Sequence, residues 1–181
     1  DVIESRGLGD VYKRQDQAFV ETDIYGNVFL AGRFFNTVDF DPGAGTANLV
    51  SNGQSDIVVA KYDGSGNLLW ANNYGGTGYD GGAGLATTSD GGVIITGWAD
   101  GTADYGGGSV SGLGNYDAFV ARYDASGNYV WATRFGSNNV DATYDVAVDG
   151  SDNAFVTGNH GWTMNLGLSL IHISEPTRLD D

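Results

Sequence analysis

The sequence predicts an all-β chain made of repeated units of four antiparallel strands, and two observations support this prediction. First, residues 56–75 read DIVVAKYDGSGNLLWANNYG, and residues 117–136 repeat them as DAFVARYDASGNYVWATRFG, 61 positions later and without a gap. Second, the chain holds 30 glycines and 23 acidic residues, of which all but three are aspartate. Aspartate and glycine favour turns whereas glutamate favours helices, so this composition indicates short strands joined by tight turns.

The two ends of the chain are related at the DNA level. Residues 5–15 read SRGLGDVYKRQ and residues 168–178 read LSLIHISEPTR, and one DNA stretch encodes the first segment on one strand and the second on the other. This inverted repeat resembles the transposon adapter used in sequencing libraries, and translated adapter does not belong to a fold. We therefore expect residues 1–15 and 168–181 to be adapter-derived and not native.

The charge balance and the residue inventory exclude several functional classes. Eight basic residues stand against 23 acidic ones, and a chain of net charge -15 repels phosphate, so we expect no nucleic-acid partner. The absence of cysteine excludes disulfides, zinc thiolate sites and thiol nucleophiles. No native apolar run is long enough for a membrane span. The lysine-poor composition, rich in glycine, asparagine, aspartate and threonine, favours an extracellular or cell-surface bacterial protein.

Each unit begins with a hairpin, of which the chain holds three copies. A short apolar strand leads into a turn of aspartate, glycine and asparagine, and the second strand ends in glycine. The copies occupy residues 18–32, 85–97 and 145–158. The second and third copies are again 61 positions apart, whereas the first unit is four residues longer. Insertions in repeats map to loops, so we place the extra residues in a long loop between the second and third strands.

The duplicated stretch supplies the second hairpin of each unit. Strands at 57–62 and 118–123 lead into Asp-x-x-Gly-Asn turns, and strands at 68–74 and 129–135 return. This turn sequence is typical of a type I turn closed by a glycine with positive φ. Trp70 and Trp131 occupy the same position in successive returning strands. We interpret these aromatic residues as a packing seam rather than a ligand site.

Four antiparallel strands per repeat, without helical patterns, describe a β-propeller blade. The segments GNVFLAG, VDFDPG and DIVVAKYDGSGNLLWANNYGG resemble the bacterial SBBP β-propeller repeat, which implies a ring of several blades. We predict an incomplete β-propeller with two four-stranded antiparallel blades and the first hairpin of a third. The predicted boundaries are 16–76 for blade one, 77–136 for blade two and 137–167 for partial blade three. The remaining blades of the parent protein are expected partners.

Catalytic residues are scarce in the native part of the chain. His160 is the single native histidine, and no Ser-His-Asp order surrounds it, so we interpret it as a loop residue and expect no enzyme activity. Carboxylates on neighbouring blades leave a glycosidase open as an alternative, because sequence spacing does not show whether two of them meet.

Two aspartates form the candidate metal site. Asp39 and Asp41 offer hard oxygen ligands just before a Pro-Gly pair, which is a donor set that suits calcium. The second unit has only one carboxylate at this place, Asp104, and the alternating acids of a calcium loop closed by glutamate are missing. The alternative is a solvated loop, and no other cofactor is expected.

The candidate ligand-binding residues follow the glycine that ends each first hairpin. Trp98 and Trp162 stand there in the second and third units, and Arg33 and Phe34 stand there in the first. In a propeller the equivalent loops emerge on one face. Side chains at these positions either line a shallow sugar or peptide site or pack as wedges between neighbouring blades.

The resemblance and these residues predict a structural or binding module of a secreted or cell-surface bacterial β-propeller protein. A protein or a glycan is the expected ligand. Two alternatives stay open: a carbohydrate-binding or carbohydrate-acting propeller, and a calcium-dependent surface module.

Overall fold

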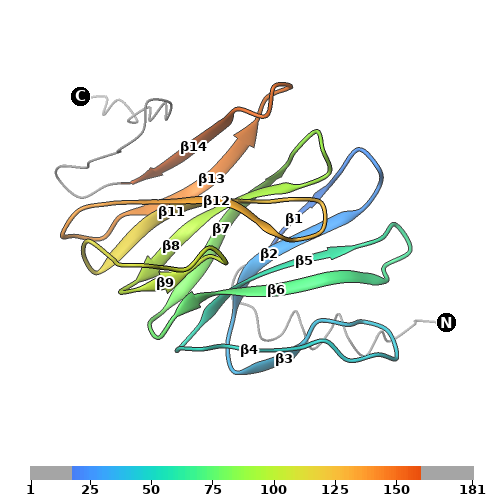
Figure 1. Cartoon of the computed structure of the whole chain (residues 1–181), viewed down its shortest axis with the longest axis horizontal. Coiled ribbons are helices and arrows are strands. Elements are labelled where there is room, and N and C mark those ends of the chain that lie inside the picture. Colours follow the sequence, from blue (N-terminus) through green and yellow to red (C-terminus); the bar gives the residue numbers. More distant parts are fainter. Residues whose placement is uncertain (1–17, 160–181) are drawn as a thin grey trace, which may run out of the picture.

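The computed structural model describes residues 18–159, and all regular secondary structure in this segment is β-strand (Figure 1). The adapter-like ends, His160 and Trp162 lie outside the described residues. The strands are β1 (Ala18–Thr22), β2 (Val28–Phe34), β3 (Thr37–Asp39), β4 (Asn48–Val50), β5 (Asp56–Tyr62), β6 (Leu68–Gly76), β7 (Asp80–Thr87), β8 (Val93–Asp100), β9 (Ala103–Asp104), β10 (Ser109–Val110), β11 (Tyr116–Tyr123), β12 (Tyr129–Phe135), β13 (Ala142–Val148) and β14 (Ala154–Asn159).

The strands form the predicted blades. Blade one has the antiparallel order β1-β2-β5-β6, blade two has β7-β8-β11-β12, and β13 pairs with β14 as the hairpin of a third unit. Figure 1 shows these units following one another from blue to orange. The all-β class and the incomplete propeller are therefore confirmed, and the duplicated stretch supplies the last two strands of each blade.

The connection between the second and third strands of a blade differs from the predicted long loop. It folds into a short extra hairpin, β3–β4 in blade one and β9–β10 in blade two. Strand β9 also pairs with the end of β6, so that blade two extends the sheet of blade one to six strands. Strands of two or three residues are too short to show an alternating pattern, which is why the sequence did not indicate them.

Strand β7 begins at Asp80, five residues before the predicted start at Leu85. The added residues are mostly glycine, which sequence reasoning assigned to a connection. Glycine is needed at position 84, where a Cβ would stand 2.9 Å from the Cα of Asp145 in β13, whereas a Cβ on Gly82 would stand at an ordinary contact distance of 3.4 Å from the amide nitrogen of Gly32 in β2. Blades one and two therefore meet backbone to backbone at this strand.

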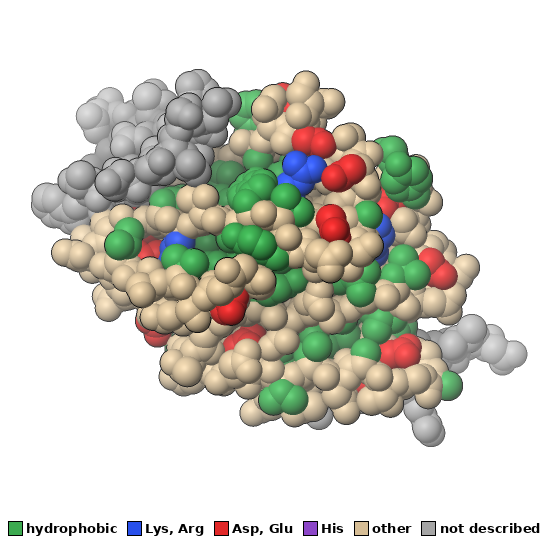
Figure 2. All heavy atoms as spheres, in the orientation of Figure 1, with side chains coloured by type: hydrophobic (Ala, Val, Ile, Leu, Met, Phe, Trp, Pro, Cys, Tyr) green, Lys and Arg blue, Asp and Glu red, His purple; other side chains and the backbone are tan. Residues whose placement is uncertain are grey.

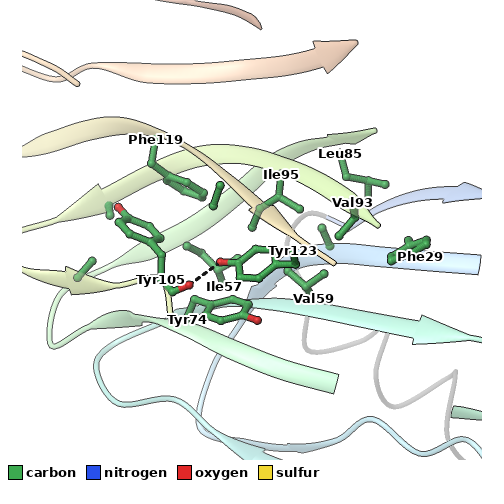
Figure 3. Packing of buried hydrophobic residues seen from close by; sticks show 14 residues of the cluster. Phe29, Ile57, Val59, Tyr74, Leu85, Val93, Ile95, Tyr105, Phe119 and Tyr123 are labelled. Atoms are coloured by element: carbon green, nitrogen blue, oxygen red, sulfur yellow. Dashed lines mark hydrogen bonds between the residues drawn. The ribbon is translucent and has the colours of Figure 1, made fainter. Parts of the chain in front are cut away.

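Aromatic side chains fill the space between blades one and two (Figure 3). Tyr74 of β6 stacks on Tyr123 of β11 with ring centroids 4.4 Å apart. The ring centroids of Tyr105 and Phe119 lie 4.8 Å apart. The Tyr123 hydroxyl donates a hydrogen bond of 3.0 Å to the Tyr105 carbonyl. Since Tyr105 follows β9, the extra hairpin of blade two helps to close this interface.

Trp70 confirms the predicted packing seam. Its ring meets Phe29 edge-on at 5.9 Å, and its indole N–H donates a hydrogen bond of 3.1 Å to the carbonyl of Ala125 in the β11–β12 turn. Trp131 packs against a second group of buried residues, which includes Phe135 of blade two and Val146 and Val156 of the third unit. The two tryptophans thus hold successive blades together.

The Asp-x-x-Gly-Asn turns have the predicted geometry. Oδ1 of Asp63 accepts hydrogen bonds from the backbone N–H groups of Ser65 and Asn67 at 2.8 and 2.9 Å, and Oδ2 accepts one from the Asn67 side chain. That side-chain hydrogen bond lowers the pKa of Asp63. Gly66 closes the turn with φ of 86°. The same bonds recur in the turns that begin at Asp23, Asp124 and Asp149.

Candidate functional site

The longer connections gather at one end of the blades, which we call the loop face. The connections 35–55, 77–79, 101–115 and 136–141 start and end there, where β2, β6, β8 and β12 end and β5, β7, β11 and β13 begin. The tight turns lie at the opposite end. The tip of the β3–β4 hairpin reaches back toward the tight turns, because the Tyr62 hydroxyl at the end of β5 donates a hydrogen bond to the Phe40 carbonyl. Because loops tolerate sequence change while the strands hold them in place, such a face is the usual position of a binding site.

Arg33 and Trp98 come together on this side of the molecule. The Arg33 guanidinium carbon lies 5.5 Å from the Trp98 ring centroid and 5.1 Å from that of Phe35. Trp98 also meets Tyr116 edge-on at 5.2 Å. We call these four half-buried residues the Arg33–Trp98 cluster. Arg33 and Phe35 come from blade one and Trp98 and Tyr116 from blade two, so the cluster bridges the two blades.

Phe34 is not part of this cluster. Its side chain is fully buried and packs edge-on against Phe40 at 5.5 Å, in a separate group with Val38 and Val58. Successive strand residues point to opposite faces, so Phe35, not Phe34, joins Arg33. Trp162 lies outside the described residues.

Trp98 also has a packing role. A Cβ on Gly81 of β7 would stand 2.8 Å from the indole ring, so the ring lies directly on a side-chain-free stretch of the neighbouring strand. The ring nevertheless stays partly exposed. Trp98 therefore packs against the neighbouring strand of its own blade and reaches Arg33 of blade one, while part of its ring stays accessible.

Asp39 and Asp41 are engaged within their own hairpin. Oδ1 of Asp39 accepts hydrogen bonds from the backbone N–H groups of Asp41 and Ala47 at 3.1 and 2.8 Å, and Oδ1 of Asp41 accepts one from Gly43 at 2.7 Å. Over residues 18–159 no three histidine, cysteine, aspartate or glutamate side chains are grouped to hold a metal ion. The geometry shows two carboxylates that close the β3–β4 loop.

Calcium titration separates loop closure from metal binding. We expect Asp39→Ala to lower the free energy of unfolding by about 1–2 kcal/mol equally in EDTA and in calcium, because it removes the acceptor for two backbone N–H groups. Asp39→Asn is the matched control, since its amide oxygen still accepts hydrogen bonds. The measurement is thermal unfolding; a calcium-dependent rise in Tm of the unmodified chain that Asp39→Asn abolishes would support the calcium module instead.

Sequence reasoning missed four buried carboxyls next to the linkers between blades. Asp56, Asp80, Asp117 and Asp141 are all fully buried. Asp117 pairs with Arg134 at 2.9 Å, while Asp80 accepts hydrogen bonds from the N–H groups of Gly76 and Asp100 at 2.7 and 3.0 Å. Burial raises the pKa of Asp80 to about 6. The signal was available, since each pair of equivalent aspartates is 61 positions apart.

No apolar helix of the length that a bilayer crossing requires occurs in the described part of the chain.

Comparison with known proteins supports the propeller assignment. Residues 130–159, which run from β12 to the end of β14, match the model of the SBBP family, a beta-propeller repeat. The chain is 29% identical over 123 residues to the uncharacterized WD repeat-containing protein L264 of Acanthamoeba polyphaga mimivirus, a match covering 62% of the chain. It is 35% identical over 110 residues, 59% of its length, to the regulatory protein FlaEY of Caulobacter vibrioides.

The chain spans only 9% and 12% of these two proteins. The four-stranded blades and the matched segment nevertheless agree: the chain carries an SBBP-type β-propeller repeat at residues 130–159 and is a propeller-type binding or structural module.

Proposed function

We propose that this chain is a binding module that holds a protein ligand on its loop face through the Arg33–Trp98 cluster. The observation that carries the proposal is the meeting of Arg33, Trp98 and Tyr116 across two blades, with each side chain half-buried. Arginine, tryptophan and tyrosine dominate the energetics of protein interfaces. Stacking already restricts these side chains, so little entropy is lost when a partner binds.

The charge of the chain points to a partner with a basic surface. The net charge is -15, and Figure 2 shows acidic side chains spread over the visible face with few basic ones. Complementary charge speeds association and selects among partners.

A secreted or cell-surface bacterial location is part of the proposal. It is supported by the acidic, lysine-poor and cysteine-free composition. Antibodies raised against the chain should label intact cells that produce the parent protein; labelling only after permeabilisation would contradict this location.

Trp98→Ala tests the binding site. Random peptides displayed on phage are selected on the immobilised chain, and the affinity of a selected synthetic peptide is then measured for each variant. We expect Trp98→Ala to weaken binding by at least about 10-fold, because loss of a central aromatic contact exceeds about 1 kcal/mol. Tyr25→Ala, which removes an exposed aromatic side chain at the opposite end, should bind as the unmodified chain does.

Both variants must keep the circular dichroism spectrum of the unmodified chain. Equal affinity of Trp98→Ala and the unmodified chain would overturn the proposed site. A glycan array provides the second arm: glycan binding that depends on Trp98, without any selected peptide, would replace the protein ligand by a carbohydrate.

A further inference from the structure

Two buried carboxyl groups meet at the junction between blades one and two. Asp56 begins β5, Asp80 begins β7, and both are fully buried. Both lie against Gly75 at the end of β6: a Cβ there would stand 2.8 Å from Oδ2 of Asp80 and 3.2 Å from Cγ of Asp56. The linker that carries the chain from one blade to the next therefore begins between two acids.

Their hydrogen bonds differ in a way that matters for ionisation. Asp56 accepts hydrogen bonds from the backbone and side chain of Asn52, and from the side chains of Ser51 and Asn73. Within residues 18–159 the Asp80 carboxylate accepts hydrogen bonds from two backbone N–H groups and from no side chain. Among the described residues neither carboxylate has an ion-pair partner within 4.0 Å. Two adjacent buried charges without a cation between them are costly, and a proton relieves that cost.

The next junction has the same two acids but a different third residue. Asp117 and Asp141 stand 61 positions after Asp56 and Asp80, and Arg134 stands 61 positions after Asn73. Nη2 of Arg134 lies 2.9 Å from Oδ2 of Asp117, and both side chains are buried. At the second junction the Arg134 guanidinium therefore pairs directly with the Asp117 carboxylate. At the first junction the uncharged amide of Asn73 occupies the equivalent position.

Groups from every neighbouring element bear on the ionisation of Asp80. Burial is the main cause that raises its pKa, the backbone hydrogen bonds from Gly76 and Asp100 lower it, Asp56 on β5 raises it and Arg134 on β12 lowers it, and the net result is a pKa of about 6. Asp100, at the end of β8, lies against the same linker, because a Cβ on Gly78 would stand 2.8 Å from its Cβ. Burial raises the pKa of the Tyr105 hydroxyl, and the charge of Asp80 adds to that rise.

We propose that the junction between blades one and two is a pH-sensitive joint, in which a proton held by the Asp56–Asp80 pair fastens the two blades in mildly acidic surroundings. The folded-state pKa of Asp80 lies above the ordinary value of 3.8, so the folded chain retains a proton that the unfolded chain has lost. The resulting stabilisation is complete below pH 3.8 and is lost as the pH rises through about 6.

The measurement is the urea unfolding equilibrium at pH 5 and pH 7.5. For the unmodified chain we expect the unfolding constant to rise about 10-fold from pH 5 to pH 7.5. Only the part of the Asp80 pKa shift that lies above pH 5 contributes to this rise. Asp80→Asn should abolish the rise. Asn73→Arg should reduce it, because it gives the first junction the cation of the second. Asp141→Asn is the matched control and should leave the rise unchanged. His160 and His172 are common to all variants, so any contribution from them cancels in the comparison.

Hydrogen exchange locates the effect. After correction for the intrinsic pH dependence of exchange, residues 75–80 should lose protection between pH 5 and pH 7.5, while residues 136–141 should not. A rise in the unfolding constant that persists in both Asp80→Asn and Asn73→Arg, or an equal loss of protection in the two linkers, would overturn the proposal. Should Asp80→Asn fail to fold, Asn73→Arg and the exchange data still decide.

Discussion

Replacing Lys61 by methionine is expected to lower the free energy of unfolding by about 3–5 kcal/mol. The Lys61 ammonium lies 3.2 Å from Oδ2 of Asp23, and their side chains are only 5% and 0% exposed. It also donates a hydrogen bond of 2.9 Å to the carbonyl of Gly91 in the β7–β8 turn of blade two. Methionine would leave the Asp23 carboxylate buried without its cation.

Asp23 stays ionised in the folded chain, which makes the loss of its partner costly. Burial raises its pKa, but hydrogen bonds from Asn27, Lys61 and Tyr25 more than offset this, so that the pKa is lowered overall. The measurement is urea unfolding monitored by circular dichroism at pH 7. Adding Asp23→Asn to Lys61→Met should recover part of the lost stability, because the double variant has no unpaired charge.

The matched control for Lys61 is Arg122, at the same position of blade two. Its Nη2 lies 3.0 Å from Oδ2 of Asp90 and 3.7 Å from Oδ2 of Asp152, but the Arg122 side chain is 22% exposed and that of Asp90 is 53% exposed. Water screens this pair, so Arg122→Met should cost about 1 kcal/mol or less. Equal losses for the two substitutions would show that burial is not the reason for the effect.

The β5–β6 and β11–β12 hairpins could be predicted because the turn sequences that indicate them are local. An aspartate four residues before an asparagine determines the turn by itself, and the exact repeat at 61 residues shows which strands are equivalent. The start of β7 could not be predicted in the same way. Gly84 is required by the backbone of Asp145 in the third unit, and nothing within residues 80–84 indicates that this backbone lies there.

The candidate site was predicted in part for similar reasons. Arg33 and Trp98 were found because both follow the end of the first hairpin, but Phe34 depended on side-chain direction, which the strand register decides. Tyr116 was missed because it reaches Trp98 only through the pairing of β8 with β11. The buried carboxyls were missed because composition assigns aspartate to turns, while Asp80 is buried between blades.

A large loss of stability from a single added methyl group is expected for Gly97→Ala. A Cβ on Gly97 would overlap the carbonyl oxygen of Gly81 and stand 2.8 Å from the Phe119 ring. Gly81 cannot withdraw, because β7 pairs with β8 on one side and a bulge between Gly82 and Gly84 fixes its direction. We expect the free energy of unfolding to fall by about 3 kcal/mol or more, which urea unfolding would measure.

Gly150→Ala is the control for Gly97→Ala, because a Cβ on Gly150 meets nothing within 4 Å. It should change stability by no more than about 0.5 kcal/mol. Gly158→Ala should behave like Gly97→Ala, since a Cβ there would overlap the carbonyl oxygen of Ala142, and β13 carries a bulge at the equivalent place. If Gly97→Ala were as stable as Gly150→Ala, the bulge would not hold β7 in place. The spacing of 61 positions between Gly97 and Gly158 would then need another cause.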